Sequence, residues 1–409
     1  MAAKVFQLKC GYKNDPWGKK GKDSLAGVLC SQTPGALELD ESKTYSEMWM
    51  GTYPTVPSRV LATDELLSEY LNKHPEVVGQ SALKKWGPEV PFLPKILSFD
   101  QALPLQVHPD KALSEKLHQT DPHKFGDPNH KPEIAIALSN FELFAGFKPL
   151  ADIEQLMKLA PLQHFVPPHA VSAFDDEVLR ELCRILLTLP PSIVSTTLTE
   201  LLTMPEAQFG PTQRYIPGLL DRLRKQYPDT DNGSLVAALL MNYVTVGPGE
   251  AVCVPADSIH AYLSGDIMEC MARSDNVINT GFCPKAERDS VDLFTRALSF
   301  QPHSVDETVL PRRKSDKGTQ WKTEVYAPPF SEFNVLATSL GAGEEETHVP
   351  LDGPSLVVVT KGSGTMRAGA ATETETMELR EGWIFFVGAG EKLHFGTDKG
   401  LALYRPYAE

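Results

Sequence analysis

Short apolar or alternating stretches dominate the first 150 positions of the chain. They include VFQLKC, FLPKILSF and EIAIALSNFELFAGF, and proline, glycine or aspartate residues separate them. Runs of roughly four to eight residues between turn-forming residues are typical of β-strands. Two stretches, near Asp64–Lys73 and Asp110–Gln119, have the spacing of helices instead. The pattern predicts a mainly β unit with two short helices.

The pattern changes between residues 151 and 244. Segments such as DDEVLRELCRILLTL and SIVSTTLTELLTM carry apolar residues three and four positions apart, and Pro190, Pro191 and Pro205 interrupt them. This spacing is typical of amphipathic helices. Strand patterns return at MNYVTVGPGEAVCVPADSIHAYL and again at PSLVVVTKGSGTMRAG and TMELREGWIFFVGAG.

We therefore expect a mainly β protein with two related barrels and an all-helical insertion. Residues 1–150 and 245–300 would form the catalytic barrel, 151–244 the helical insertion, and 301–409 a second barrel with a structural role. In that second barrel we expect GEEETH (343–348) to be a solvated acidic loop and His394 to be a surface histidine, with no second metal site.

Composition excludes several classes of protein. The 409 residues carry a formal net charge of −14, which disfavours binding to nucleic acid. There is no run of about 18 apolar residues, so we expect no membrane span. The six cysteines form no CxxC pair and the start of the chain lacks a signal-peptide pattern, so we expect a cytoplasmic protein. We also expect a monomer.

Two strand segments carry candidate metal ligands. In LPLQVHP, Gln106 and His108 are two positions apart and so share one face of a strand. In HKPEIAIAL, Glu133 shares a face with Ala135 and Ala137, which suits a cavity wall, while the isoleucines face a core. Taken singly, a solvent-facing QxH pair and a surface carboxylate are the ordinary alternatives.

A third segment adds His260 in VCVPADSIHAYL, with Tyr262 on the same strand face. A histidine in such a strand is usually a core residue. Together, however, Gln106, His108, Glu133 and His260 offer two nitrogens, two oxygens and no thiolate, a donor set that suits a catalytic zinc ion. We expect one Zn²⁺ per chain at these four residues.

The lysines nearby are candidates for the chemistry. Lys131, two positions before Glu133, would face the metal if the alternation continues through Pro132, and it would act as acid or base there. A surface lysine is the alternative. Lys95 lies among the aliphatic residues of FLPKILSF and either serves the site or reaches solvent at a strand end.

Several long motifs carry a family resemblance. QVHPDK, HKPE, HAYLSGDIMECMARSDN, NDPWGKKGKDSLAG and YSEMWMGTYP, in most of the chain, resemble the motifs of type I phosphomannose isomerases. The resemblance implies two cupin-type (jelly-roll) barrels with a helical insertion, and zinc ligands at the four positions above. It also implies interconversion of mannose 6-phosphate and fructose 6-phosphate through an enediol, which supplies GDP-mannose synthesis.

The resemblance assigns further roles around the sugar phosphate. It places Lys285 at the phosphate, with Arg273 and Arg288 as nearby alternatives. Other residues of the family motifs would bind the substrate or orient its hydroxyls: Lys95, Tyr262, Glu269, Trp17, Glu47 and Asp275. We take Lys131, Arg273 and Asp275 as the catalytic candidates.

Two positions depart from the family pattern. Asn279 stands where many members have an arginine regarded as catalytic, and Pro104 stands where many have a serine. An amide cannot supply the fixed charge of a guanidinium, so another cation must act in this chain if that charge is needed, and Arg273 is the nearest candidate.

Two other functions use similar residues. A non-haem iron oxygenase could bind iron through His108, Glu133 and His260, although Gln106 and the lysines argue against it. A non-enzymatic sugar-binding cupin is the second alternative. It would be expected to carry a secretory signal and a degraded metal site.

Overall fold

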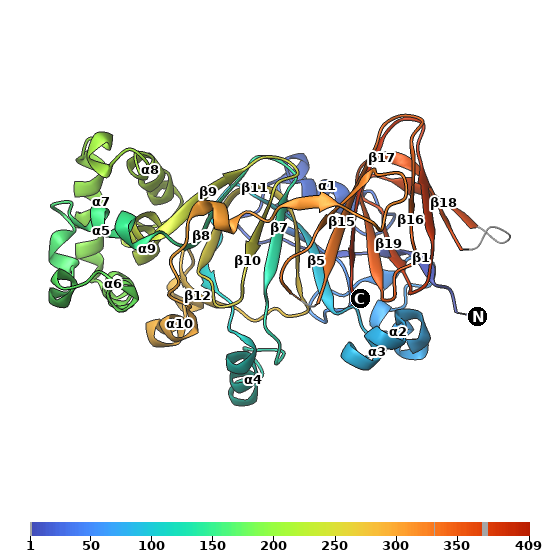
Figure 1. The fold of residues 1–409 in the computed structure, drawn as a ribbon, viewed down its shortest axis with the longest axis horizontal. Helices are drawn as coiled ribbons and strands as arrows, with labels where there is room; N and C mark the ends of the chain where they lie inside the picture. Colours follow the sequence, from blue (N-terminus) through green and yellow to red (C-terminus); the bar gives the residue numbers. More distant parts are fainter. Residues whose placement is uncertain (1, 331, 370–374) are drawn as a thin grey trace.

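The computed structural model describes residues 2–330, 332–369 and 375–409. Two curled β-sheets lie side by side (Figure 1). A group of helices lies next to the sheet that contains β8 (Phe141–Phe147) and β9 (Met241–Val246), on the side away from the other sheet, so the molecule is elongated. One sheet has ten strands and the other has eleven. This architecture confirms the prediction of a mainly β protein with a helical segment in the middle of the chain.

The ten-stranded sheet contains the candidate site, with the central path β10-β7-β11-β5-β3-β2. Its strands are β2 (Gly11–Lys13), β3 (Glu47–Trp49), β5 (Phe92–Phe99), β6 (Leu105–Val107), β7 (Glu133–Ala137), β8 (Phe141–Phe147), β9 (Met241–Val246), β10 (Ala251–Val254), β11 (His260–Ala272) and β12 (Ile278–Gly281). The long strand β11 is antiparallel to β5 and β7 along one part and to β6 and β8 along another.

The eleven-stranded sheet has the path β13-β14-β15-β21-β17-β19-β1-β4. Its strands are β1 (Val5–Lys9), β4 (Arg59–Val60), β13 (Arg312–Lys314), β14 (Thr323–Tyr326), β15 (Asn334–Leu340), β16 (Glu345–His348), β17 (Ser355–Ala368), β18 (Glu375–Arg380), β19 (Ile384–Val387), β20 (Leu393–Gly396) and β21 (Leu401–Tyr407).

The first strand of the chain belongs to this second sheet. Val5 of β1 pairs with Val387 of β19, and Leu8 pairs with both Ile384 and Val60. The division into three units at residues 150, 245 and 300 remains a proposal. The pairing adds that two strands from the first 60 residues complete the sheet formed by the last hundred.

Ten α-helices lie within the described residues. They are α1 (Leu25–Ser31), α2 (Leu67–Lys73), α3 (Gln80–Trp86), α4 (Lys111–Thr120), α5 (Leu150–Met157), α6 (Asp176–Thr188), α7 (Pro191–Thr203), α8 (Ile216–Gln226), α9 (Asn232–Leu240) and α10 (Val291–Ala297). Short 3₁₀ turns occupy Gly21–Asp23, Pro75–Val78, Gln163–Phe165, Pro168–Val171, Glu206–Phe209, Lys285–Glu287 and Val305–Thr308. Helices α2 and α4 confirm the two helices expected in the first 150 residues, whereas α1 and α3 are two further helices there that the pattern did not predict. Helices α5–α9 confirm the helical segment.

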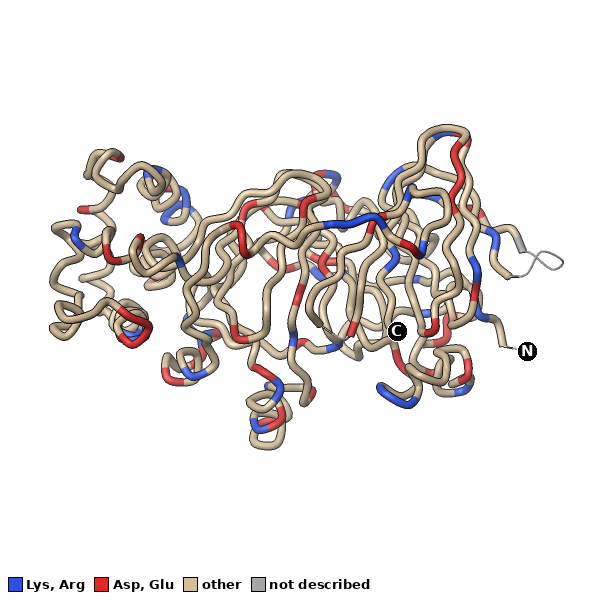
Figure 2. The backbone as a smooth tube through the Cα atoms, in the orientation of Figure 1, with Lys and Arg blue, Asp and Glu red and all other residues tan. Residues whose placement is uncertain are grey.

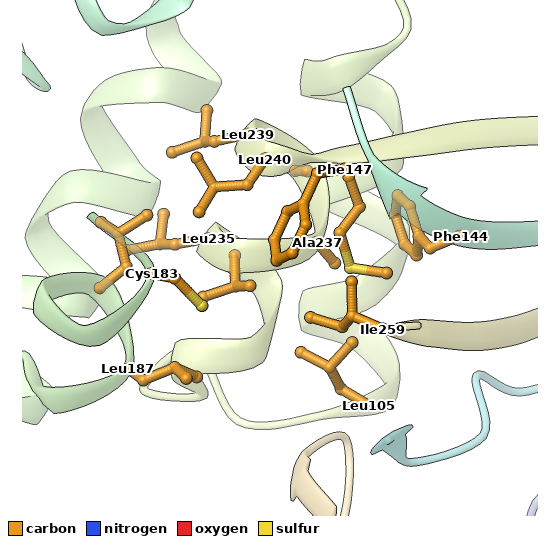
Figure 3. Close-up of a cluster of buried hydrophobic side chains, with 14 of the residues drawn as sticks. Leu105, Phe144, Phe147, Cys183, Leu187, Leu235, Ala237, Leu239, Leu240 and Ile259 are labelled. Atoms are coloured by element: carbon orange, nitrogen blue, oxygen red, sulfur yellow. The ribbon is translucent and has the colours of Figure 1, made fainter. Parts of the chain in front are cut away.

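Helix α9 joins the helical group to the ten-stranded sheet. The Asp231 side chain caps its first turn by accepting a hydrogen bond from the Gly233 amide. Leu235 and Leu239 of this helix lie in one apolar cluster with Phe144 and Phe147 of β8 (Figure 3). A helix that is apolar on all sides is stable only when it is surrounded by protein, which explains why α9 lies between the sheet and the other helices.

Substitution of Leu239 tests how much this cluster contributes to the free energy of unfolding. Its side chain is fully buried, so Leu239→Ala is expected to lower the free energy of unfolding by about 2–5 kcal/mol. Ile193→Ala, at a position on α7 that is 39% exposed, is the control and should change it by less than about 1 kcal/mol. Urea denaturation followed by circular dichroism measures both. Equal losses in the two variants would contradict the assigned packing.

Strand β7 has the two faces that its alternating sequence predicts. Ile134 and Ile136 lie in an apolar cluster that continues into the second sheet through residues such as Leu356. Ala135 and Ala137 lie in a different cluster with Tyr262. The small side chains leave space on the inner face of the barrel, and Glu133 lies at the start of that face.

Charged residues of both signs are spread along the described chain (Figure 2). Within those residues, no single helix combines the length and the apolar content needed to cross a membrane. Only α6 and α7 taken together, bent by 108° at their junction, satisfy such a test by length and composition. Val178, Leu182 and Leu198 of this pair are buried in the core that they share with α9.

Candidate active site

Three strands bring two histidines and a carboxylate together. His108 follows β6, Glu133 begins β7 and His260 begins β11. Nε2 of His108 lies 3.1 Å from one carboxylate oxygen of Glu133, and Nε2 of His260 lies 3.7 Å from the other. All three residues are buried, and their ligand atoms lie within 4.8 Å of one another. Such a group has the dimensions of a metal site.

The other ring nitrogens determine the tautomers of both histidines. Nδ1 of His108 lies 2.8 Å from the carbonyl oxygen of Asn276, and Nδ1 of His260 lies 3.0 Å from that of Ser258. Because a carbonyl oxygen only accepts, each Nδ1 carries a proton and each Nε2 has a free lone pair. Both Nε2 atoms are buried without a hydrogen-bond partner. Two lone pairs and a carboxylate therefore face each other, and a cation between them resolves the repulsion.

Burial also keeps both rings neutral. It lowers the pKa of His108 to about 4, with a further contribution from the charge of Lys131. Burial likewise lowers the pKa of His260. For Glu133, burial opposes ionisation, but the neighbouring His108 and Lys131 outweigh it and hold the pKa well below its usual range. At neutral pH the group offers two neutral imidazoles and one carboxylate, the protonation states that metal binding requires.

Gln106 lies beside this group. It pairs directly with His260 across the β6–β11 ladder, and it lines the same cavity as Glu133. With its amide oxygen the donor set becomes two nitrogens and two oxygens, which fits Zn²⁺ and lacks the thiolates of most structural zinc sites. The structure brings His108, Glu133 and His260 together and places Gln106 on the strand paired with His260.

Two of the four residues, Gln106 and Glu133, border a cavity of about 230 Å³. Most of its polar lining is charged. The polar and charged residues that line it are Lys13, Asp15, Glu47, Lys95, Gln106, Lys131, Glu133, Glu269, Asp275, Asn279 and Glu287, and the aromatic ones are Trp17 and Tyr262. A concave site with this many ionisable groups suits a small, strongly polar ligand.

Lys95 is the most enclosed cation of the cavity. Its Nζ lies 3.3 Å from Glu47, 3.9 Å from Glu269 and 4.0 Å from the centre of the Trp49 ring. Burial alone would lower the pKa of Lys95, but Glu47 and other carboxylates raise it above its usual value. The lysine therefore stays charged. Its side chain lines the cavity and does not reach solvent at a strand end.

Lys131 lies between the ligand group and Asp275. Its Nζ is 3.3 Å from Glu133 and 4.0 Å from Asp275, so it does face the metal side of β7. The Tyr262 hydroxyl donates a hydrogen bond of 3.1 Å to Glu133. Burial, with the charge of Glu133 nearby, raises the pKa of Glu269 to about 8. The cavity therefore holds, close to Lys131, a buried carboxyl group that carries a proton at neutral pH.

The structure does not bring two of the expected residues to this cavity. The Arg273 guanidinium turns to the other side, where it contacts Glu89 at 2.7 Å and Thr52. Lys285 lines a separate hollow beside Tyr227 and Asp231. Neither residue lines the cavity in this structure, and the roles expected for Arg273 at the reacting atoms and for Lys285 at the phosphate stay predictions.

Arg288, the other alternative for the phosphate, lies in the same separate hollow as Lys285. It is held there by an ion pair of 2.7 Å with Asp231. Arg273, Lys285 and Arg288 were expected to replace the family arginine or to hold the phosphate. None of these three residues lines the cavity.

Both positions that depart from the family pattern do lie at the cavity. Asn279 is on β12 opposite Gln106, and Pro104 lines the cavity beside it. The Asn279 backbone amide donates to Asp289, whereas its side-chain oxygen is buried without a partner. The cavity wall therefore presents an uncharged amide where the family pattern has a cation.

Sequence patterns alone did not reveal four residues of the site. These are Lys13, Asp15, Trp49 and Glu287. The pairing of Lys13 with Glu47 across β2 and β3 is the signal that places Lys13 in the cavity. That register is set by contacts between distant segments, so local alternation in a three-residue strand could not predict it.

The acidic segment of the second sheet also differs from expectation. GEEETH was expected to be a solvated loop, but Glu346 and His348 on β16 are fully buried. The Glu346 carboxylate accepts hydrogen bonds from the backbone amides of Gln320 and Lys322 and from the Thr323 hydroxyl. These donors make burial of the charge possible. His394 is partly buried beside Thr347.

A family model, related sequences and solved structures all indicate the same family of proteins. Residues 5–150 match the family described as phosphomannose isomerase type I, catalytic domain. The mannose-6-phosphate isomerase of Cryptococcus neoformans is 36% identical, and the match covers 100% of each chain. That of Schizosaccharomyces pombe is also 36% identical, over 99% of this chain and 100% of the relative.

A solved structure of a mannose 6-phosphate isomerase has the same fold as this chain. It is a crystal structure of mannose 6-phosphate isomerase in its zinc-bound holo form, 25% identical in sequence. The match covers 100% of both chains with a TM-score of 0.80. The similarity over the full length supports the two cupin-type barrels with a helical insertion.

Proposed function

This chain belongs to the type I phosphomannose isomerase family, and we propose that its charged cavity interconverts mannose 6-phosphate and fructose 6-phosphate with zinc held by Gln106, His108, Glu133 and His260. The observation that carries the proposal is the arrangement of the histidines. Two buried Nε2 lone pairs point at one buried carboxylate, and a cation between them would stabilise this arrangement. The protein is an enzyme, an aldose–ketose isomerase.

The reaction requires an electrophile at the sugar oxygens and groups that move protons. The substrate ring opens, C2 loses a proton to give an enediol, and C1 gains one. When bound, zinc polarises the carbonyl and hydroxyl oxygens and stabilises negative charge on them. The protein must then bind the sugar, exclude water and hold a proton donor and acceptor near C1 and C2.

We assign the proton transfer to Lys131. Its Nζ lies beside Glu133, and Asp275 on its other side orients it. Glu269 and Tyr262 face the same cavity: Glu269 carries a proton at neutral pH and can donate a hydrogen bond to a sugar oxygen, and the Tyr262 hydroxyl, which donates to Glu133, can accept one from a sugar hydroxyl. Lys95 and Glu47 form a fixed ion pair on the wall, and Trp17 contributes apolar surface.

The partners and the location form part of the same proposal. We propose a monomer that acts on sugar phosphates in the cytoplasm and supplies mannose units for GDP-mannose synthesis. The net charge of −14 and the six cysteines, all free thiols in the structure, support a reducing compartment and no role with nucleic acid.

Coupled turnover of mannose 6-phosphate to fructose 6-phosphate tests the proposal. Activity is expected to fall to background after chelation and to return when zinc is restored, because no other residue of the cavity replaces the electrophile. A folded, zinc-loaded protein without turnover would contradict it and favour a sugar-binding protein. Oxygen consumption with iron would favour an oxygenase instead.

A further inference from the structure

The cations of the cavity differ in how fully carboxylates neutralise them. Lys95 and Lys131 have only 4% and 7% of their side chains exposed, and each lies within 3.3 Å of a carboxylate oxygen. Both charges are therefore matched by Glu47 and Glu133 before any ligand enters. A dianionic phosphoryl group needs a cation with donors to spare.

Lys13 is such a cation. It ends β2 at the rim of the cavity, with 34% of its side chain exposed. Its Nζ lies 3.8 Å from Asp15 and 4.0 Å from Glu47, beyond the length of a charge-assisted hydrogen bond. Both carboxylates have closer partners: Asp15 accepts from the Ser46 hydroxyl at 2.6 Å, and Glu47 lies 3.3 Å from Lys95.

Three other cations near the cavity are paired elsewhere. Lys19 forms an ion pair of 2.6 Å with Asp266, and it does not line the cavity. Arg273 and Arg288 are each paired at 2.7 Å outside it. Asn279 brings no charge to the opposite wall.

The position of Lys13 also fits the shape of the substrate. In a hexose 6-phosphate the reacting carbons C1 and C2 lie at one end of the molecule and the phosphate lies at the other. Lys131 is next to Glu133 in the ligand group, whereas the Glu47–Lys95 ion pair separates Lys13 from that group. One lysine thus serves the reacting end, and the other is available at the far end.

We propose that Lys13 binds the phosphoryl group of the substrate. The inference rests on the proposed function of the cavity. On binding, the phosphate oxygens replace Asp15 and Glu47 as the nearest anions to the Lys13 ammonium. Lys13 is a binding residue and takes no part in proton transfer at C1 or C2.

Steady-state kinetics of Lys13→Met on zinc-loaded protein tests this. KM for mannose 6-phosphate and the inhibition constant of inorganic phosphate should both rise by about 10- to 100-fold, with kcat within about threefold of the unaltered enzyme. Lys13→Arg keeps the charge and should stay within about fivefold in KM. Lys20→Met makes the same charge change at an exposed neighbour outside the cavity, and no change is expected.

Zinc content and the far-ultraviolet circular dichroism spectrum show that each variant is folded. An unchanged KM in Lys13→Met would overturn the assignment, as would a loss confined to kcat. If the unaltered zinc-loaded protein shows no turnover, the proposed function fails, and calorimetric titration with inorganic phosphate then decides on Lys13. In that titration, equal affinities of the unaltered protein and Lys13→Met would overturn it, and weaker binding by the variant alone would support it.

Discussion

Glu133→Gln is expected to remove zinc from the protein and to lower kcat by roughly a hundredfold to a thousandfold, because a neutral amide replaces the carboxylate that faces both histidines. The fold should survive. In the zinc-free protein two Nε2 lone pairs point at an anion, and the glutamine amide can donate a hydrogen bond to one of them. The zinc-free variant should therefore be at least as stable as the zinc-free unaltered protein.

Thermal unfolding with and without zinc separates these effects. Zinc should raise the Tm of the unaltered protein, since a ligand that binds only the folded state stabilises it, and it should leave the Tm of Glu133→Gln unchanged. Glu115→Gln, at an exposed position on α4, is the control for the change in charge. Zinc bound with normal stoichiometry to Glu133→Gln would show that the carboxylate is not a ligand.

Local patterns predicted those parts of the fold that depend on neighbours in the sequence. The alternation of β7 is visible in EIAIA, and its two faces lie in two different apolar clusters as expected. The three- and four-residue spacing of α6 predicted its buried face in the same way. In both cases one buried face imposes the periodicity that the sequence displays.

Features that depend on distant pairing were not predictable in this way. Strand β1 pairs with β19, more than 370 positions later in the chain, and nothing in VFQLK indicates which sheet it joins. The burial of Glu346 depends on the backbone amides of Gln320 and Lys322, which a local count of charges cannot include. An acidic run indicates a solvated loop only when no donors are folded over it.

The same distinction applies to the candidate site. The side chains of Gln106, His108, Glu133 and His260 lie on regular strands or directly at their ends, where two-residue alternation determines the direction of a side chain. Arg273, like His108, directly follows the last residue of a strand, but its side chain turns to Glu89 on a distant segment, a contact that strand phase does not predict. Ligand chemistry and strand phase sufficed to select the four candidate ligands, whereas the positions of the cations around the cavity required the register of the whole sheet.

Lys131→Met is expected to lower kcat by roughly a hundredfold to ten-thousandfold while KM changes little, because the variant loses the group that moves protons at C1 and C2. Zinc should remain bound. Lys131 is not a ligand, and removal of a cation 3.3 Å from Glu133 increases the attraction between that carboxylate and a divalent ion. Exchange of the C2 hydrogen with solvent deuterium, followed by NMR, should slow in parallel with kcat.

The two cavity lysines then give opposite kinetic signatures in one protein. Lys131→Met should act on kcat and solvent exchange, whereas Lys13→Met should act on KM and on inhibition by inorganic phosphate. Lys116→Met, exposed on α4, makes the same charge change away from the cavity and should leave every value unaltered. A Lys131→Met enzyme with normal kcat and full zinc would move the proton transfer to Glu269, whose buried carboxyl group has a pKa of about 8 and lines the same cavity.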